Sequence, residues 1–385
     1  MKHCRIAFKV KAPTEYFEEV VAKRQYCGLK IKPDGENGKG AYSEVGFKEG
    51  DLILKDQMLV GAQHSSNKID CLVCSFCFRF IGSIELQIGR KLHLQELGVS
   101  ADDECGSSDG PRKRNSIPRD TIQSLMSGNL RLPYSEEFPL PSVFPCQGGC
   151  GEAYYCSKSC AEADWDSFHS LLCIGNGSSS PNTEALSKFM QHANETNDIF
   201  ILAAKVISYT ILRYRKFKAA HKRWGKHTQG GNCVFPLLLE AWKPVSMGYK
   251  RRWWDCIALP EDVDSCDETE FRMQIKDLAF EKEAEKITKS FLDALGEDYS
   301  VSCEGTAFFP LQSCMNHSCI PNAKAFKREE DRDGQATILA LRPIIKGEEI
   351  TISYIDEELP YEERQELLAD YGFTCKCPRC SEEQP

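Results

Sequence analysis

The alternation of apolar and polar positions predicts β-strands near both ends of the chain. Four stretches have the alternating or continuous apolar character that is typical of strands: "YCGLKIK", "GDLILKDQMLV", "ATILALR" and "EEITISY". The first two lie before residue 62, and the other two lie after residue 335. We therefore expect a β unit that a very long insertion divides in two.

Other stretches predict helices before and inside this insertion. Residues 13–24 are expected to form a short helix, and residues 183–227 and 267–295 are predicted to be helical as well. Residues 100–142 are polar and rich in Gly, Ser and Pro, which predicts a disordered loop. The run "GNGSSSPN" at 175–182 is typical of a linker.

The cysteine content changes this picture. The chain has 385 residues and 20 cysteines, but its N-terminus lacks the uninterrupted hydrophobic segment of a secretory signal. No apolar run is long enough to span a membrane. We therefore expect a nuclear or cytosolic protein, in which disulfides are rare and clustered cysteines more often hold metal. The net charge of −9 argues against a general nucleic-acid coat and favours basic partners.

Four short-spaced pairs of soft ligands lie in the first part of the insertion, enough for two tetrahedral zinc sites. Two or three intervening residues let a turn, or one face of a helical turn, present both ligands to one ion. The order of the pairs suggests that they interleave, although Cys71 with Cys74 is an alternative first pair. The predicted sets are Cys74, Cys77, Cys156 and Cys160 for one ion, and Cys146, Cys150, His169 and Cys173 for the other.

The C-terminal run "CKCPRC" offers a third metal site that is one ligand short. A tetrahedral zinc needs four ligands, and Cys319 in "NHSCIPN" can complete the set. Cys303 and Cys314 are the alternatives for this fourth position. The predicted set is Cys319, Cys375, Cys377 and Cys380, which gives about three zinc ions per chain in all.

Several of these pieces resemble a known domain. "GENGKGAYS", "NHSCIPN", "GEEITISY" and "YGFTCKCPRC" resemble the SET domain, the protein-lysine methyltransferase fold, and the inserted zinc cluster resembles a MYND finger. The chain thus resembles the SET-and-MYND (SMYD) family. The resemblance is strongest to its short members without a C-terminal helical repeat domain and to the related plant trithorax-related SET proteins. Two features depart from that pattern: the third finger pair is Cys-x3-Cys rather than Cys-x2-Cys, and the insertion within the finger is long.

The resemblance implies a fold class and a division of the chain. The fold would be a mainly β SET fold, with small twisted sheets and a pseudoknot, split by a zinc-binding MYND insertion and a helical SET insert; it is α+β as a whole. The expected parts are an N-terminal helical extension (1–25), the first part of the SET domain (26–70), the finger with a disordered insertion at about 100–142 (71–174), a linker (175–182), the helical SET insert (183–304), the C-terminal part of the SET core (305–360) and a post-SET zinc segment (361–385).

The activity that the resemblance implies is S-adenosylmethionine-dependent protein-lysine N-methyltransfer to a deprotonated amine. The expected substrate is a histone H3 or H4 tail, which would make the protein a chromatin regulator. The alternatives are a lysine of a non-histone protein, for example a ribosomal one, or a docking scaffold with an inactive SET domain. Because the sulfonium methyl is already activated, the site has to align a lysine amine and keep it neutral.

The same resemblance implies roles for individual residues. Tyr354 would place its hydroxyl beside the transferring methyl, and Tyr371 would line the lysine channel; these two are the expected catalytic residues. Phe373 would line the channel and contact the cofactor. The expected cofactor-binding residues are Gly38, Lys39, Gly40, Ser313, Asn316, His317, Tyr354 and Phe373.

The sequence also suggests binding partners for three regions of the chain. The finger is expected to bind proline-rich peptides, and the basic run at 213–226 to contact nucleosomal DNA, although a solvated helix face explains that run equally well. The acidic run at 356–366 follows Tyr354 and could attract a basic substrate tail. We expect no membrane partner and a nuclear location, with the cytoplasm as a second location.

Overall fold

The structure is a computed structural model. It describes residues 13–24, 28–34, 38–97, 117–133, 135–175, 181–197, 199–224, 234–247, 273–274, 289–291, 294–295, 300–301, 303–326 and 333–384.

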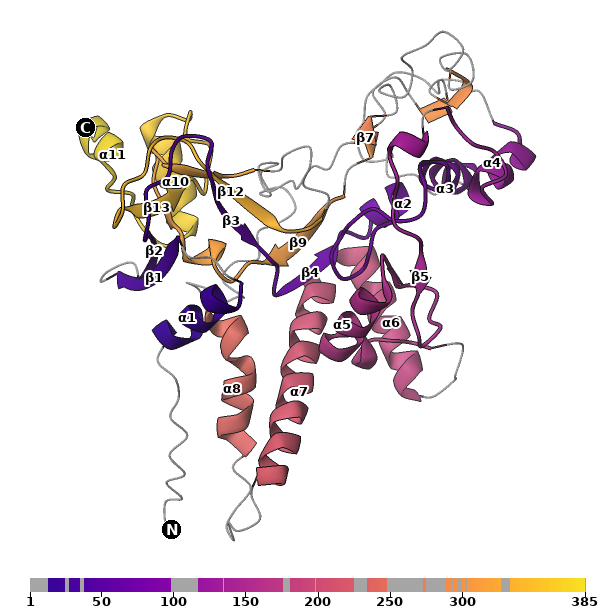
Figure 1. Cartoon of the computed structure of the whole chain (residues 1–385), viewed down its shortest axis with the longest axis horizontal. Helices are drawn as coiled ribbons and strands as arrows, with labels where there is room; N and C mark the ends of the chain where they lie inside the picture. The colour runs from indigo at the N-terminus through magenta and orange to yellow at the C-terminus, as the bar shows by residue number, and fades with distance from the viewer. Residues whose placement is uncertain are drawn as a thin grey trace.

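A four-stranded sheet joins the two ends of the chain (Figure 1). Its order is β1 (Leu29–Asp34), β2 (Gly38–Ser43), β13 (Glu349–Ile352) and β10 (Asn316–His317). The first three strands are antiparallel to their neighbours, whereas β10 runs parallel to β13. The predicted strands at the N- and C-terminal ends therefore share one sheet.

A second sheet and a strand pair complete this β region. The sheet has the order β11 (Ala323–Ala325), β12 (Ala336–Ala340) and β3 (Leu52–Asp56), and β4 (Val60–Gln63) pairs with β9 (Gly305–Phe308). Apolar residues of the two sheets are buried in one core, whereas Val60 and Ala62 of β4 belong to a neighbouring core. The first core includes Ile31, Ala41, Leu54, Leu311, Ile338 and Ile350.

One short helix packs against this core, and two more follow the last strand. The predicted N-terminal helix is observed as α1 (Pro13–Lys23), and Phe17 buries its ring in the core. The helices α10 (Tyr361–Asp370) and α11 (Pro378–Glu383) follow the last strand and end the chain beside it (Figure 1).

The cysteine-rich part of the insertion has little regular structure. It contains α2 (Asn67–Asp70), the strand pair β5 (Phe144–Pro145) and β6 (Tyr154–Tyr155), α5 (Lys158–Ser167) and the 3₁₀ turn His169–Leu171. Ser157 caps α5 by accepting a hydrogen bond from the backbone of Cys160. Metal ligands could compensate for this lack of secondary structure.

The predicted disordered loop at 100–142 is wrong for residues 117–133 and 135–142, which are placed in the fold. They include α4 (Arg119–Met126), which packs on α3 (Ile84–Glu96) around Ile88, Ile122 and Leu125. The buried Glu85 carboxylate accepts hydrogen bonds from the backbone of Leu132 and from the hydroxyl of Ser135. The polar composition of the segment hides these few anchoring residues; the rest of the predicted loop lies outside the described residues.

The helical insert differs from its prediction in two ways: the first helical segment is divided in two, and a further helix follows it. The single helix expected at 183–227 is two helices, α6 (Pro181–Thr196) and α7 (Ile199–Trp224), because the Asn197 side chain accepts from the backbone of Ile199 and starts a new helix. The helix α8 (Val234–Met247) packs beside α7.

The helix predicted at 267–295 lies mostly outside the described residues. The prediction is wrong at β7 (Met273–Gln274), a strand that pairs with β8 (Ser300–Val301). Phe291 packs against the α3 and α4 core. Among the described helices, none combines the length and the apolar character that crossing a membrane requires. The α+β class with small sheets is as expected.

Candidate functional site

The segment "NHSCIPN" is tied to β13 by side-chain and backbone hydrogen bonds. Its last residue, Asn322, is 1% exposed; its Oδ1 accepts from the backbone N–H of Thr351 at 2.9 Å, and its Nδ2 donates to the Glu349 carbonyl at 2.7 Å. The Asn316 amide donates to the Glu349 carboxylate. Since β10 and β13 are parallel neighbours, the segment and the strand that leads to Tyr354 form one rigid unit.

Four rings converge at the end of this unit. The Tyr354 ring centroid lies 5.2 Å from that of Tyr371, 5.4 Å from that of His317 and 6.3 Å from that of Phe373. The Tyr354 hydroxyl donates to the carbonyl of Met315, and burial raises the pKa of Tyr354 above its ordinary value. This hydroxyl therefore stays protonated at physiological pH. The structure brings together the expected catalytic pair and the expected cofactor contact Phe373.

The His317 side chain is held within the protein. Its Nδ1 accepts the backbone N–H of Tyr354 at 3.1 Å, and its Nε2 lies 3.2 Å from Cys319 Sγ. Burial, with a smaller effect of Arg364, lowers the pKa of His317 to about 4, so the ring is neutral. Because Nδ1 is an acceptor, the proton sits on Nε2 and is donated to the sulfur. Only the backbone of His317 is left for the expected cofactor contact.

The glycine segment expected to approach the cofactor, Gly38 to Gly40, lies at the start of strand β2. Gly38 has a φ of 82°, and no heavy atom lies within 4 Å of a Cβ built there. At Gly40 an added Cβ would lie 2.7 Å from the Glu349 carboxylate. The Lys39 ammonium lies 4.7 Å from the centroid of the Phe17 ring, and burial lowers its pKa. Lys39 thus links β2 to α1, a contact that the sequence does not predict.

Two more residues of the "LQSC" turn are placed nearby. The Ser313 hydroxyl donates to the carbonyl of Pro310 at 3.2 Å. Gln312 Oε1 is buried and has no hydrogen-bond partner among the described residues. Sequence reasoning did not single out Gln312 or Glu349, since neither carries a motif signal of its own.

The tail cysteines meet Cys319. The sulfurs of Cys319, Cys375, Cys377 and Cys380 all lie within 4.8 Å of one another. Cys319 Sγ is 3.5 Å from Cys380 Sγ and 3.9 Å from Cys375 Sγ, close to the edge of about 3.8 Å that a tetrahedral zinc–thiolate site requires. A disulfide would need about 2.0 Å. The alternatives lie elsewhere: Cys314 donates to the carbonyl of Pro310, and Cys303 packs beside Cys71.

Backbone donors favour the thiolate form of Cys377, whereas burial raises the pKa values of Cys319 and Cys375. Burial opposes the ionisation of Cys377, but backbone N–H groups of Cys380 and Cys319 outweigh it and lower the pKa of Cys377 to about 7. A thiolate is the form that binds zinc. The tail set therefore has the ligand type, number and spacing of a structural zinc site.

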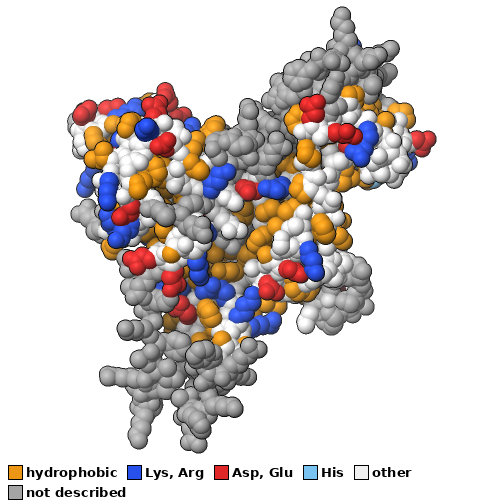
Figure 2. Space-filling view, viewed as in Figure 1, with side chains coloured by type: hydrophobic (Ala, Val, Ile, Leu, Met, Phe, Trp, Pro, Cys, Tyr) orange, Lys and Arg blue, Asp and Glu red, His pale blue; other side chains and the backbone are white. Residues whose placement is uncertain are grey.

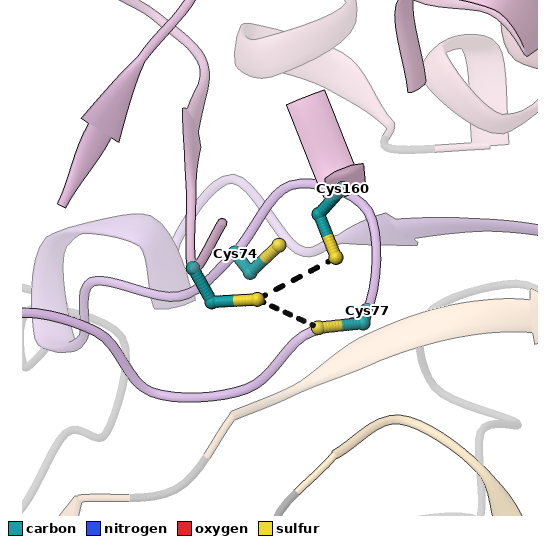
Figure 3. Close-up of side chains that lie close together, drawn as sticks. Cys74, Cys77 and Cys160 are labelled. Carbon is teal, nitrogen blue, oxygen red and sulfur yellow. Dashed lines mark hydrogen bonds between the residues drawn. The ribbon is translucent and has the colours of Figure 1, made fainter. Parts of the chain in front are cut away.

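The finger cysteines gather in the interleaved pattern. Each of the two predicted sets has its ligand atoms within 4.8 Å of one another, and Figure 3 shows Cys74, Cys77 and Cys160 pointing toward a common centre. Cys156 Sγ lies 3.6 Å from Cys77 Sγ and 3.5 Å from Cys160 Sγ.

The second finger set has a mixed chemistry. His169 Nε2 lies 3.2 Å from Cys146 Sγ and 3.4 Å from Cys150 Sγ, and Cys146 Sγ lies 3.7 Å from Cys173 Sγ. Burial lowers the pKa of His169, which favours the neutral ring that binds a metal. Cys71 is not part of either set, since its thiol is placed beside the Asn67 side chain.

Comparison with known proteins agrees with this geometry. The SET domain family model matches residues 38–355. Histone-lysine N-methyltransferase ATXR2 of Arabidopsis thaliana is 54% identical over 96% of this chain and 93% of its own length. Protein-lysine N-trimethyltransferase SMYD5 of Gallus gallus is 25% identical over 89% of this chain and 83% of its own. A SET and MYND domain-containing protein of Dictyostelium discoideum is 46% identical over 20% of each chain.

The chain belongs to the SET domain family. The expected SET fold and the resemblance to SET-and-MYND and plant trithorax-related proteins are confirmed. The expected activity class, an S-adenosylmethionine-dependent protein-lysine N-methyltransferase, is confirmed with them. The three cysteine and histidine sets are compatible with the expected three zinc ions.

The residues of this SET domain fit its cofactor. S-adenosylmethionine carries a cationic sulfonium, and aromatic faces such as those of Tyr354 and Phe373 attract cations. The open space at Gly38 leaves the backbone accessible to a ligand. The buried Gln312 Oε1 is an acceptor that a ligand N–H could satisfy.

Proposed function

We propose that this SET-domain protein methylates a lysine in a histone tail, and that it does so in the nucleus. The substrate assignment is supported by the printed name of the Arabidopsis thaliana relative, a histone-lysine N-methyltransferase that is 54% identical over 96% of the chain. The acidic exposed residues Glu358, Glu362 and Glu363, which follow Tyr354 in the sequence, would favour a basic tail.

The observation that carries the proposed site is the convergence of Tyr354, Tyr371 and Phe373 beside the "NHSC" segment. Tyr371 is 48% exposed, whereas Tyr354 is partly buried, so Tyr371 would form the mouth and Tyr354 the inner wall of a lysine channel. A lysine amine that enters between these rings loses water, which lowers its pKa and favours the neutral, nucleophilic form.

When bound, S-adenosylmethionine supplies an activated methyl group. In our proposal the Tyr354 hydroxyl and the Met315 carbonyl, which are hydrogen-bonded to each other, orient the groups that meet at the inner end of the channel. Asn316 and the backbone of His317 would hold the adenosine part, with Ser313 beside them, and Gly38, Lys39 and Gly40 the methionine part. Phe373 would cover the cofactor from the tail side. The three cysteine and histidine sets would each hold a zinc ion.

The test is methyl transfer from labelled S-adenosylmethionine to recombinant histones H3 and H4, with ribosomal proteins as a parallel substrate. Wild type should label a histone, and Tyr354→Phe should lower the rate by about 100-fold, as the loss of one oriented donor does. Tyr361→Phe is the control, because Tyr361 packs in the same tail cluster outside the proposed channel. Label on ribosomal proteins alone would support the non-histone alternative, and no label on either would support a scaffold.

The predicted peptide and DNA partners stay predictions. Figure 2 shows Lys and Arg side chains gathered over the α7 region of this face. Part of this charge has local partners, since Arg213 lies 4.9 Å from the centroid of the Phe217 ring and Lys216 pairs with Asp166 at 3.5 Å.

A further inference from the structure

The largest fully buried side chain near the tail cysteines is an arginine. Arg364 lies on α10, and its side chain is 0% exposed. A charge removed from water is costly unless anions and hydrogen bonds compensate for it. The contacts of Arg364 therefore indicate which negatively charged group the buried guanidinium compensates.

One side of the guanidinium faces the metal-binding set. Nη2 lies 3.7 Å from Cys380 Sγ and also donates to the Glu383 carboxylate, and Nη1 donates to the carbonyl of Leu359. Glu383 is 37% exposed and could bind a surface cation equally well. The pairing with Glu383 therefore does not explain why the arginine is buried, whereas the sulfur contact does.

The charge of the tail set supplies the reason. Four thiolates around one Zn²⁺ leave two negative charges in a largely buried cluster. A cation at hydrogen-bond distance from one sulfur offsets part of this charge. Groups that contact metal ligands from outside are known to affect metal retention strongly.

The end of the same helix positions the aromatic wall, which consists of Tyr371 and Phe373. Leu368 lies one turn after Arg364 and is buried in the tail cluster. The backbone N–H groups of Tyr371 and Phe373 both donate to the Leu368 carbonyl, at 3.1 and 3.5 Å. The position of α10 against the cysteines therefore sets the positions of both rings.

We propose that Arg364 is a positioning residue for methyl transfer: it neutralises the tail thiolate set and fixes α10 against α11, so that Tyr371 and Phe373 keep their places. The inference rests on the proposed function, in which these cysteines hold zinc. It assigns a function to a side chain that touches neither the proposed cofactor contacts nor the proposed lysine channel.

The test follows zinc release from the full-length protein to a coloured chelator, together with the affinity for S-adenosylmethionine by calorimetry. In Arg364→Met one of three zinc ions should leave about 10- to 100-fold faster than in wild type, and the affinity for the cofactor should fall with it. Arg364→Lys keeps the charge and should restore slow release in part. Arg379→Met is the matched control, because Arg379 also pairs with Glu383, at 2.8 Å, but has no sulfur contact among its described hydrogen bonds.

Several results of these measurements would contradict the inference. Wild-type release rates in Arg364→Met, or equal acceleration in Arg379→Met, would overturn the inference and leave the proposed function intact. Equal acceleration of all three ions would also overturn it, since it would indicate a general loss of structure. A wild-type protein that holds only two zinc ions would overturn the tail assignment itself and this inference with it.

Discussion

One set in the finger (Cys74, Cys77, Cys156 and Cys160) and the set in the tail each consist of four cysteines, but the surroundings of these two sets differ. The finger set packs with the neighbouring Cys3His set of the same finger. The tail set packs directly against Tyr354 and Phe373, and its Cys319 lies 3.2 Å from His317 Nε2. The same ligand chemistry thus stabilises a small module in one region and adjoins the proposed reaction site in the other.

The cations beside these two sets also differ in what they contact. In the tail, Arg364 contacts a sulfur directly. In the finger, the Lys205 ammonium donates to the carbonyl of Gly61 at 2.8 Å and to that of Ser75 at 3.4 Å, and Ser75 lies inside the Cys74–Cys77 turn. The finger cation therefore joins the finger backbone to β4, whereas the tail cation acts on the ligand set itself. We expect substitutions in the tail to affect catalysis more than those in the finger.

The largest expected difference comes from removing one ligand of each set. Cys375→Ser should lower the rate of methyl transfer by at least about 100-fold, because Phe373 lies two residues away and a small displacement in such a site is costly. Cys156→Ser should lose a zinc ion but keep the rate within about tenfold of wild type, since effects at distant sites are largely independent. The measurements are initial rates at saturating cofactor and elemental analysis of each protein.

Equal losses of rate in the two variants, each with one zinc missing, would contradict the distinction between the regions. A normal rate in Cys375→Ser would show instead that the aromatic wall does not depend on the tail metal.

A smaller effect is expected at the link between the tail set and Tyr354. His317→Ala leaves the buried backbone N–H of Tyr354 without its partner, at a cost of about 1–3 kcal/mol. If this free-energy cost displaces the groups of the reaction site, the rate of methyl transfer should drop by about tenfold to 100-fold. All three zinc ions should stay bound. The sequence alone predicts a stronger result, complete loss of transfer, because the resemblance places His317 among the cofactor-binding residues.

The conservative variant His317→Asn distinguishes the contact of this ring with Tyr354 from its contact with Cys319. In His317→Asn the amide oxygen can accept from Tyr354 but the contact with Cys319 is lost, so most of the activity should return. Activity as low as in His317→Ala would assign the effect to the sulfur contact.

Cysteine spacing made the cysteine and histidine clusters predictable. Pairs such as Cys156 and Cys160 are close in sequence, and zinc accepts few ligand types in one geometry. Local patterns also sufficed for α1 and for the strands β1, β3, β12 and β13. The break at Asn197 was missed because a side-chain cap competes locally with a continuous helix.

Contacts across the fold were not predictable in this way. Glu349 holds Asn316, and Thr351 donates to Asn322, only because β10 and β13 are parallel in one register. Arg364 lies in the run "YEERQELLAD", whose charges are typical of a surface helix. Arg364 becomes buried only because the C-terminal tail folds back against Cys319. The sequence pattern of a single segment does not predict that long-range contact.

The smallest effect on catalysis is expected at the finger cation. Lys205→Met keeps the apolar stem but leaves the carbonyls of Gly61 and Ser75 without this donor, which should lower the free energy of unfolding by about 1–3 kcal/mol. Lys205 lines a cavity of about 100 Å³ between β4, the finger and α7, so water can replace part of the loss and the lower figure is favoured. The rate of methyl transfer should stay near wild type. The check is urea unfolding beside initial rates. The exposed Lys188→Met on α6 is the control, since the ion pair of Lys188 among the described residues is with Glu184 of its own helix. A fall in rate as large as that of Cys375→Ser, at unchanged stability, would mean that the finger reaches the reaction site after all.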